Sequence, residues 1–228
     1  MIGPMRAALS KKSDPSTLLG NLPDMLRALA ERGELRRYRK DTLLIQEDDL
    51  GDTLFIILAG RLRCYSVGDN EREITYGVYG PGEYLGELSL DGGRRSASVI
   101  TLETSTCAVV SRACLQAFIG EHPSFAFELL AKVIRRARAA TLTARQMALN
   151  DVYGRLKLLL DGTAQPLGSP HPSGHRLINQ RLTHQEMSHR LGCSREMVSR
   201  LMKDLERGSY LKIDASGLTL LRTLPTRW

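Results

Sequence analysis

Residues 86–99 (GELSLDGGRRSASV) place one acid, two arginines and three serines around a tight Asp-Gly-Gly turn. Backbone N–H groups at glycine-rich turns can approach an anion closely, and arginine offers a planar fork that matches a phosphate. One interpretation is therefore a loop that holds a phosphate, with Glu87 contacting a group attached to it. The other is a plain hairpin whose Asp-Gly tip is exposed to solvent.

A second stretch, residues 182–206 (LTHQEMSHRLGCSREMVSRLMKDLE), predicts two short helices joined by a turn. Thr183 can cap the first helix, and Glu186 completes a capping box three residues later. This helix is expected to end at Leu191, because Gly192 follows it. Ser194 can cap a second helix that runs to about Glu206.

The second predicted helix carries two i,i+4 pairs on one face, Arg195 with Ser199 and Glu196 with Arg200. Arginine suits the O6/N7 edge of guanine, and glutamate accepts from the amino group of cytosine. The opposite face is apolar (Met197, Val198, Leu201 and Leu205) and is expected to be buried. A solvated charged surface is the alternative, but small Ser188, the turn glycine and a following hairpin at residues 214–217 favour a winged helix-turn-helix that binds DNA.

Other parts of the chain must position these two stretches. The first 20 or so residues are polar and read as a loose arm, and Asp24–Arg32 has helical spacing. From Gly33 to about Val110, short β-rich runs recur roughly every ten residues, which is typical of an all-β barrel or sandwich. Residues 161–174 (DGTAQPLGSPHPSG) predict a loop.

A long helix is predicted over residues 123–150, because residues 124–150 contain neither Gly nor Pro. Its apolar or small residues alternate in steps of three and four, the seam of a two-helix coiled coil. The alternative is a single helix packed on its own β domain. The narrow seam, flanked by arginines, favours a homodimer; it consists of Phe127, Leu130, Ile134, Ala137, Thr141, Ala144 and Ala148.

Composition and charge limit the class of protein. A chain of 228 residues has room for two domains, and its longest apolar run, residues 54–59, is far shorter than a membrane helix needs. With no signal-peptide pattern and no CxxC pair among its four cysteines, the chain is expected in the cytoplasm, without a disulfide framework, a metal site or a membrane partner. Residues 151–228 carry 12 Lys and Arg against 7 Asp and Glu, which favours a polyanionic partner.

The chain resembles the CRP/FNR family of bacterial transcription regulators, of the cyclic-AMP receptor protein type. The resemblance runs from about Leu22 to Arg222 and rests on GDTLFIILAG, YGPGEYLGELSLDGGRRSASV, NDVYGRL and the helix-turn-helix stretch. It implies an α+β chain with a jelly-roll-like β-roll that binds a cyclic nucleotide, a long dimerisation helix and a winged helix-turn-helix. The corresponding segments are 1–22 (flexible arm), 23–120 (β-roll), 121–150 (dimerisation helix) and 151–228 (DNA-binding domain).

The resemblance also assigns residues to the ligand. Residues 86–97 correspond to the phosphate-binding cassette of the family, in which Arg95 and Ser96 meet the cyclic phosphate and Glu87 accepts from the ribose 2′-hydroxyl. Leu88 and Val99 are expected to pack as barrel wall. The full set of implied ligand residues is Gly86, Glu87, Leu88, Arg95, Ser96, Ala97, Arg136 and Thr141. The implied DNA contacts are Thr183, Gln185, Ser194, Arg195, Glu196, Ser199 and Arg200.

Two departures from the family pattern bear on the ligand. Relatives that bind cyclic AMP carry a Thr-Ser pair on the long helix for the adenine, whereas this chain has Ala140 and Thr141. Arg94 adds a second positive charge beside Arg95. Cyclic AMP is therefore the first expectation, with cyclic GMP, cyclic di-GMP or a ligand-independent regulator as alternatives. The implied partners are a palindromic DNA operator, a second copy of the chain through residues 123–150, and RNA polymerase.

Competing functions lack the residues they need. An iron–sulfur sensor needs an N-terminal cysteine cluster, and residues 1–63 contain no cysteine. A haem sensor needs axial ligands, and His122, at a predicted helix start, is expected to be structural. An enzyme would have to use Ser96 or Cys193 as nucleophile; the β domain offers no histidine as a base, and Cys193 lies in the predicted turn. No catalytic residue is expected. The C-terminal sequence also argues against a cyclic-nucleotide domain attached to a kinase or channel.

Overall fold

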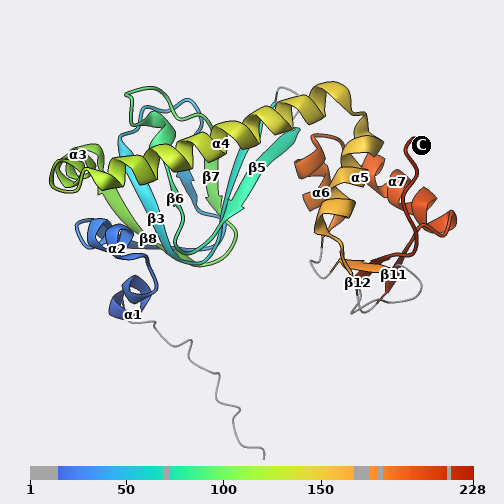
Figure 1. Ribbon diagram of the computed structural model, residues 1–228, viewed down its shortest axis with the longest axis horizontal. Helices are drawn as coiled ribbons and strands as arrows, with labels where there is room; N and C mark the ends of the chain where they lie inside the picture. The colour runs from blue at the N-terminus through green and yellow to red at the C-terminus, as the bar shows by residue number, and fades with distance from the viewer. Residues whose placement is uncertain (1–14, 69–71, 167–174, 179–181, 215–216) are drawn as a thin grey trace, which may run out of the picture. The chain divides into compact units, whose positions relative to one another are not determined.

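The computed structural model describes residues 15–68, 72–166, 175–178, 182–214 and 217–228. The chain forms two compact units, Met1–Cys64 with Val78–Ala131 and Tyr65–Gly77 with Lys132–Trp228. The division crosses the long helix α4, which Figure 1 shows as one continuous element.

The N-terminal half is built from two four-stranded sheets, with strand orders β1-β8-β3-β6 and β2-β7-β4-β5 (Figure 1). The recurring β-rich runs are therefore confirmed as strands. Their bounds are β1 Glu34–Tyr38, β2 Leu43–Ile45, β3 Thr53–Ala59, β4 Leu62–Val67, β5 Glu73–Tyr79, β6 Tyr84–Leu85, β7 Ser98–Thr101 and β8 Ser105–Ser111.

The longest apolar run of the chain, residues 54–59, lies in strand β3, which is buried on both faces. Its side chains alternate between two cores, as the period of two requires. Leu54 and Ile56 pack with buried residues of the helices, including Phe118. Phe55 and Ile57 pack with buried residues of other strands. A strand buried on both faces has no place for polar residues, so the run is continuous.

Short helices precede and follow the strands: α1 Pro15–Gly20, α2 Asp24–Ala30, the 3₁₀ helix η1 Glu87–Ser89, and α3 Arg112–Glu121. Ser111 caps α3 by accepting a hydrogen bond from the backbone N–H of Cys114 at 3.2 Å. The expectation of a loose arm up to residue 22 differs from the structure over residues 15–22. These residues include α1 and Leu22, which is buried because it joins the core beneath β3.

The long helix α4 spans Ser124–Leu149, which confirms the predicted helix over residues 123–150. Phe125 of α4 packs edge-on against Phe118 of α3, with ring centroids 5.3 Å apart. It is the one buried residue of α4. All seven predicted seam residues are exposed in the single chain, and Phe127 is exposed by 75%. An apolar seam of this length without cover in one chain is the surface that a partner helix would bury.

The C-terminal part contains α5 Val152–Thr163, α6 His184–Leu191 and α7 Arg195–Arg207, with the sheet β11-β12-β10-β9. Its strands are β9 Gln165–Pro166, β10 Arg176–Ile178, β11 Leu211–Asp214 and β12 Gly217–Leu220. The predicted loop from residue 161 begins later than expected, because α5 continues to Thr163. Its residues 167–174 lie outside the described part of the chain, as do Ala215 and Ser216 in the predicted wing turn.

Candidate nucleotide-binding loop and DNA-binding helices

The loop at residues 86–97 begins with a backbone turn that only glycine adopts readily. Gly86 has φ 99°, in the left-handed region, and a side chain there would collide with the carbonyl oxygen of Thr53. This turn starts η1, which places Glu87 with only 5% of its surface exposed. A carboxylate held this far inside a protein is placed for a specific hydroxyl or cation rather than for solvation.

Arg95 is buried beside this turn, with 6% of its surface exposed. Its Nη1 donates to the carbonyl oxygen of Gly86 at 3.1 Å and to the hydroxyl of Ser89 at 2.8 Å. Its Nη2 donates to the hydroxyl of Thr53 at 2.9 Å. Burial lowers the pKa of Arg95 from its ordinary value, while the carboxylates of Asp52 and Glu87 act in the opposite direction. The fork is thus held by protein oxygens under the loop.

The segment before β3 supports Arg95 from its other side. Gly51 lies directly against the guanidinium, and a Cβ at this position would collide with it. The backbone N–H of Arg95 donates to Asp49 O at 2.9 Å, and the N–H of Asp48 donates to Arg95 O at 2.9 Å. Residues 48–51 therefore fix the backbone that carries Arg95, through contacts that are far apart in the sequence.

The other predicted loop residues are not equally placed. Ala97 and Val99 are buried, whereas Ser96 is exposed. The expectation that Leu88 packs as barrel wall is wrong, because 47% of its surface is exposed. The reason is the 3₁₀ helix: it turns the side chains of Glu87 and Ser89 inward and leaves the intervening Leu88 outside.

Arg94, the second positive charge of the loop, is exposed and does not join Arg95 in the interior. Its Nη1 donates to the carbonyl oxygen of Asp48 at 2.6 Å.

The predicted ligand residues on α4 belong to the second unit: Arg136 is half-buried and Thr141 is exposed. The Thr141 hydroxyl donates to Ala137 O one turn earlier, at 3.0 Å. Its contact with a ligand remains a prediction.

The predicted caps of the DNA-binding helices are confirmed. The hydroxyl of Thr183 accepts from Glu186 N at 3.1 Å, and the Glu186 carboxylate accepts from Thr183 N at 2.8 Å. Gly192 ends α6 with φ 63°, and Ser194 caps α7 by accepting from Met197 N at 3.2 Å. These caps fix where each helix begins, and so which residues of α7 face outward.

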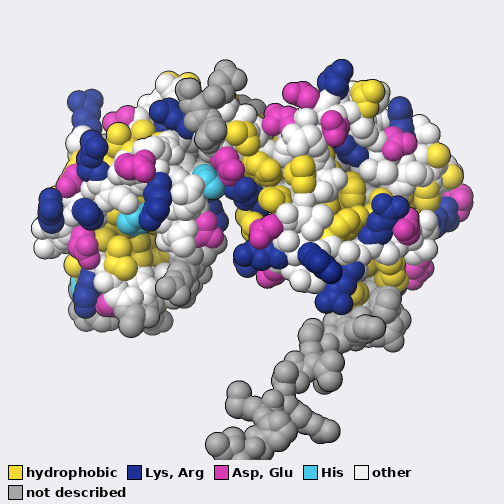
Figure 2. Space-filling view, turned by 180° about the vertical axis from the view of Figure 1, so that it is seen from behind, with side chains coloured by type: hydrophobic (Ala, Val, Ile, Leu, Met, Phe, Trp, Pro, Cys, Tyr) yellow, Lys and Arg dark blue, Asp and Glu magenta, His cyan; other side chains and the backbone are white. Residues whose placement is uncertain are grey.

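Of the four apolar residues of α7 predicted to be buried, Val198, Leu201 and Leu205 are buried, whereas Met197 is half-buried against the same core. Ser188, also buried, lies on α6 where the two helices meet. On the outer face of α7 a surface hollow of about 370 Å³ is lined by Arg195, Glu196, Ser199, Arg200 and Lys203. Several Lys and Arg side chains, dark blue in Figure 2, lie on the surface of this part of the chain (left in that view).

Two details refine this face. Lys203 was missed by the sequence analysis, although it follows Ser199 by four residues and so continues the same stripe. The second detail concerns Glu196, whose carboxylate accepts hydrogen bonds from the backbone N–H of Glu196 itself and from the side chain of Ser194. Both hydrogen bonds lower the pKa of Glu196. Glu196 is therefore an ionised acceptor at neutral pH. Of the other predicted DNA contacts, Thr183, Gln185 and Ser194 are exposed.

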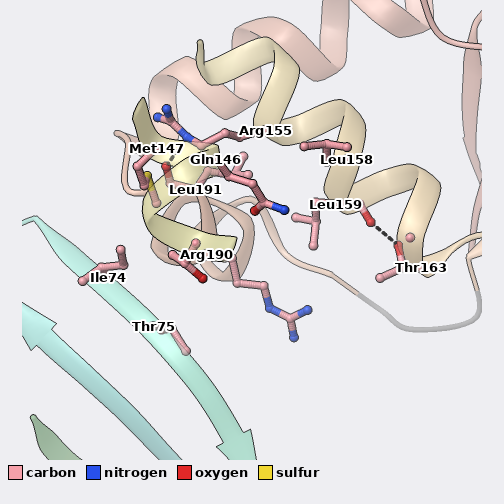
Figure 3. Close-up of a pocket in the computed structure, with 12 residues that line it drawn as sticks. Ile74, Thr75, Gln146, Met147, Arg155, Leu158, Leu159, Thr163, Arg190 and Leu191 are labelled. Atoms are coloured by element: carbon pink, nitrogen blue, oxygen red, sulfur yellow. Dashed lines mark hydrogen bonds between the residues drawn. The ribbon is translucent and has the colours of Figure 1, made fainter. Parts of the chain in front are cut away.

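A cavity of about 340 Å³ lies in the second unit near the end of α4 (Figure 3). Gln146 and Met147 of α4, Leu158 and Leu159 of α5, and Leu191 of α6 line it. Ile74 and Thr75 of β5 lie on its other side. Figure 3 also shows Arg155 of α5 bonded to Leu191 at its edge.

Two protein-family models match the segments of the chain that contain these candidate sites. A model of the cyclic nucleotide-binding domain matches residues 35–122, and a model of the Crp-like helix-turn-helix domain matches residues 156–223. These two modules in one chain define a DNA-binding regulator with a nucleotide-binding domain. The chain belongs to the CRP/FNR family of transcription regulators.

Individual relatives cover most of the chain. The cAMP-activated global transcriptional regulator CRP of Haemophilus influenzae is 30% identical over 190 residues, which are 82% of this chain and 83% of that protein. The cAMP-activated regulator Vfr of Pseudomonas aeruginosa is 29% identical over 194 residues, 82% of this chain and 89% of Vfr. The solved structure of the c-di-GMP responsive global regulator CLP of Xanthomonas campestris has a TM-score of 0.73 and 25% identity, covering 87% of this chain and 99% of that one.

These relatives are transcription regulators and not enzymes, and family membership indicates DNA binding and dimerisation for this chain. Within the described residues, no cluster of three or more His, Cys, Asp and Glu could hold a metal ion. No helix in the described part of the chain is long and apolar enough to span a membrane.

Proposed function

We propose that this regulator binds a palindromic DNA site as a homodimer and that a cyclic nucleotide in the β-roll controls its DNA affinity. The observation that carries the proposal is that Glu87 and Arg95 are both buried in the loop that begins at Gly86. A buried carboxylate and a buried guanidinium within one glycine-turned loop supply an acceptor for a ribose hydroxyl and a donor for a phosphate. Ser96, exposed on the same loop, adds a hydroxyl donor.

Cyclic AMP is the first candidate effector, supported by the cAMP-activated relatives CRP and Vfr. Cyclic di-GMP is the second, supported by the likeness to the c-di-GMP responsive CLP and by Arg94, whose exposed side chain adds charge at the rim of the loop. Ala140 offers no hydrogen bond to an adenine, which is why the two ligands must be compared directly.

The proposed DNA contacts are the outer face of α7 and the capped starts of α6 and α7. The residues that face the major groove are Arg195, Glu196, Ser199 and Arg200. Those that face the phosphate backbone of the DNA are Thr183, Gln185 and Ser194. The exposed seam of α4 supports the dimer that a two-fold operator requires. RNA polymerase is a further proposed partner, because the relatives are transcription regulators. Such a regulator acts in the cytoplasm, where its operator lies.

Titration calorimetry on the full-length chain with cyclic AMP, cyclic GMP and cyclic di-GMP tests the proposal. One nucleotide should bind and should raise the thermal unfolding temperature, since a ligand at 100 times its Kd adds about 2.7 kcal/mol to the free energy of unfolding. The same nucleotide should increase the affinity for DNA selected from a random duplex library. The proposal fails if none of the three binds or if the chain selects no DNA sequence.

A further inference from the structure

The first helix of the helix-turn-helix contacts the DNA-facing surface of the second through one hydrogen bond. Nδ1 of His184 lies 2.8 Å from the hydroxyl oxygen of Ser199. His184 is the first residue of α6 and Ser199 lies midway along α7, so the bond joins two helices. Both side chains are half-buried, and Ser199 lines the hollow on the outer face of α7.

From this contact we propose that His184 is a positioning residue that sets the orientation of the Ser199 hydroxyl and thereby the base preference at one position of each half-site. The inference rests on the proposed DNA binding by α7. It concerns His184, which is not among the DNA contacts implied by the family resemblance.

A serine on a helix has another common bonding choice, the carbonyl oxygen one turn earlier. Other helical hydroxyls among the described residues make that choice: Thr141 donates to Ala137 O at 3.0 Å, Thr163 to Leu159 O at 2.8 Å, and Ser188 to Gln185 O at 2.8 Å. The hydroxyl of Ser199 instead bonds to a side chain on the neighbouring helix. It is therefore directed by His184 rather than by its own helix.

The effect on DNA binding follows from the number of hydrogen bonds that the Ser199 hydroxyl and the His184 imidazole can donate and accept. A hydroxyl has one donor and two acceptor positions, and a neutral imidazole has one donor and one acceptor nitrogen. If Nδ1 carries the proton, Oγ of Ser199 accepts it and its own hydrogen is left for an acceptor on a base. If Nδ1 accepts the serine hydrogen, the oxygen is left to accept from an amino group on a base. In both arrangements the hydroxyl is ordered before DNA binds, which reduces the entropy lost on binding.

The caps at the starts of α6 and α7 hold the backbones that carry His184 and Ser199, and so restrict the orientation of the Ser199 hydroxyl. The reciprocal hydrogen bonds between Thr183 and Glu186 fix the backbone on which His184 sits. Ser194 fixes the start of α7, and buried Val198, next to Ser199, holds that turn against the core. Because both backbones are held, loss of the imidazole should release the hydroxyl without moving the helix.

The test uses the full-length chain and the DNA sequence it selects from a random duplex library, with cyclic AMP and without nucleotide. Relative affinities for every single-base substitution of the selected site are then measured for Ser199→Ala, His184→Leu and the double variant. In Ser199→Ala, the ratio of the affinity for the preferred base to that for the other bases should fall about 3- to 10-fold at one position per half-site. This is the effect of losing one oriented hydrogen bond. His184→Leu should lose a similar factor at the same position, and the double variant should lose no more.

Conservative variants separate positioning from general damage. Asn at position 184 keeps an amide group near Nδ1 of the histidine, whereas Gln carries it further out. His184→Asn should therefore retain the preference and His184→Gln should not, a comparison that stands even if His184→Leu fails to fold. His122→Leu, in the other unit, removes a half-buried imidazole that packs at a tilt against Phe118 and should change no base preference.

The inference is overturned if His184→Leu and His184→Gln keep wild-type discrimination at the position that Ser199→Ala alters, or if Ser199→Ala alters none. Arg195→Ala and Arg200→Ala are measured in the same assay. If they weaken binding while the His184 variants do not change preference, the inference alone is wrong. If the wild-type chain selects no sequence, the proposed function is wrong.

Discussion

Arg155 joins the end of the long helix to the first helix of the helix-turn-helix. Its Nε donates to the carbonyl oxygen of Leu191 at 3.0 Å, and its Nη1 donates to the carbonyl oxygen of Asn150 at 2.9 Å. Both carbonyls lie at helix ends, where backbone acceptors lack partners within the helix. Because one guanidinium spans both, a movement of α4 against α6 must break or rebuild one of these bonds.

Replacing this residue should weaken the link between nucleotide and DNA. Arg155→Met keeps an apolar stem but leaves two carbonyl oxygens without their donor, which should cost about 1–3 kcal/mol in the free energy of unfolding. The ratio of DNA affinities with and without nucleotide should fall, while nucleotide affinity stays close to wild type. Calorimetry and fluorescence anisotropy measure the two affinities. Arg227→Met, at an exposed position, is the control. An unchanged ratio in Arg155→Met would contradict a coupling role.

Arg95 should be essential for nucleotide binding, and lysine should not replace it. Arg95→Ala removes the guanidinium proposed for the phosphate and the hydrogen bonds that it donates to Gly86 O, Ser89 Oγ and Thr53 Oγ1. Titration with the cognate nucleotide should show no binding. Arg95→Lys should recover little affinity, because an ammonium group lacks the planar fork. Arg94→Ala is the matched control for cyclic AMP, since Arg94 is exposed and bonds to Asp48 O. Normal titration of Arg95→Ala would refute the assignment.

The two arginines of α7 that we propose to contact bases should each affect one part of the operator. Arg195→Ala and Arg200→Ala should each cost about 1–3 kcal/mol of binding free energy and relax the preference at one base pair. From the family resemblance, half-sites close to TGTGA are expected, with centres ~34 Å apart on one DNA face. Lys203→Ala should instead weaken binding evenly across sequences and reduce its salt dependence, as loss of a phosphate contact does. If both arginine variants bind the matched and the mismatched sites with the same affinities as the wild-type chain, the recognition-helix assignment is wrong.

Features of this chain that depend on interactions between residues close in sequence could be predicted. The caps of α6 and α7 were predicted because each lies within three residues of its partner: Thr183 with Glu186, and Ser194 with Met197. The seam of α4 was predicted because a helical period is a local signal. The strands of the β-roll were predicted from the same kind of short-range pattern.

Features that depend on distant contacts were not predicted. The inward position of Arg95 depends on Gly51 and Thr53, more than 40 residues earlier in the sequence. The contact of His184 with Ser199 depends on how the two helices pack, which no spacing within one helix reveals. Leu88 was misplaced because the 3₁₀ turn at Gly86 breaks the alternation that a strand would have.

Dimerisation should depend on the exposed seam of α4. Ile134→Lys places a charge in the middle of the seam, where burial against a partner helix would strip its water, so the dimer should dissociate. Sedimentation equilibrium should then give the mass of one chain, 25.3 kDa, in place of twice that value. Ile213→Lys alters an apolar residue of similar exposure on β11, 47% against 41% for Ile134, and should leave the mass unchanged. A dimer that survives Ile134→Lys would place the interface elsewhere.

Cys107 should be inert in the folded chain and should make stability fall at high pH. Its side chain has no exposed surface, and burial raises the pKa of the thiol from 9.0 to about 12. Since the folded pKa exceeds the unfolded one, the contribution is fully present below pH 9 and is lost as pH rises toward 12. Iodoacetamide at pH 8 should therefore modify half-buried Cys64 and Cys114 well before Cys107, as peptide mass spectrometry can measure. In denaturant all cysteines should react alike, so equal rates in the native protein would show that the interior beneath β8 opens readily.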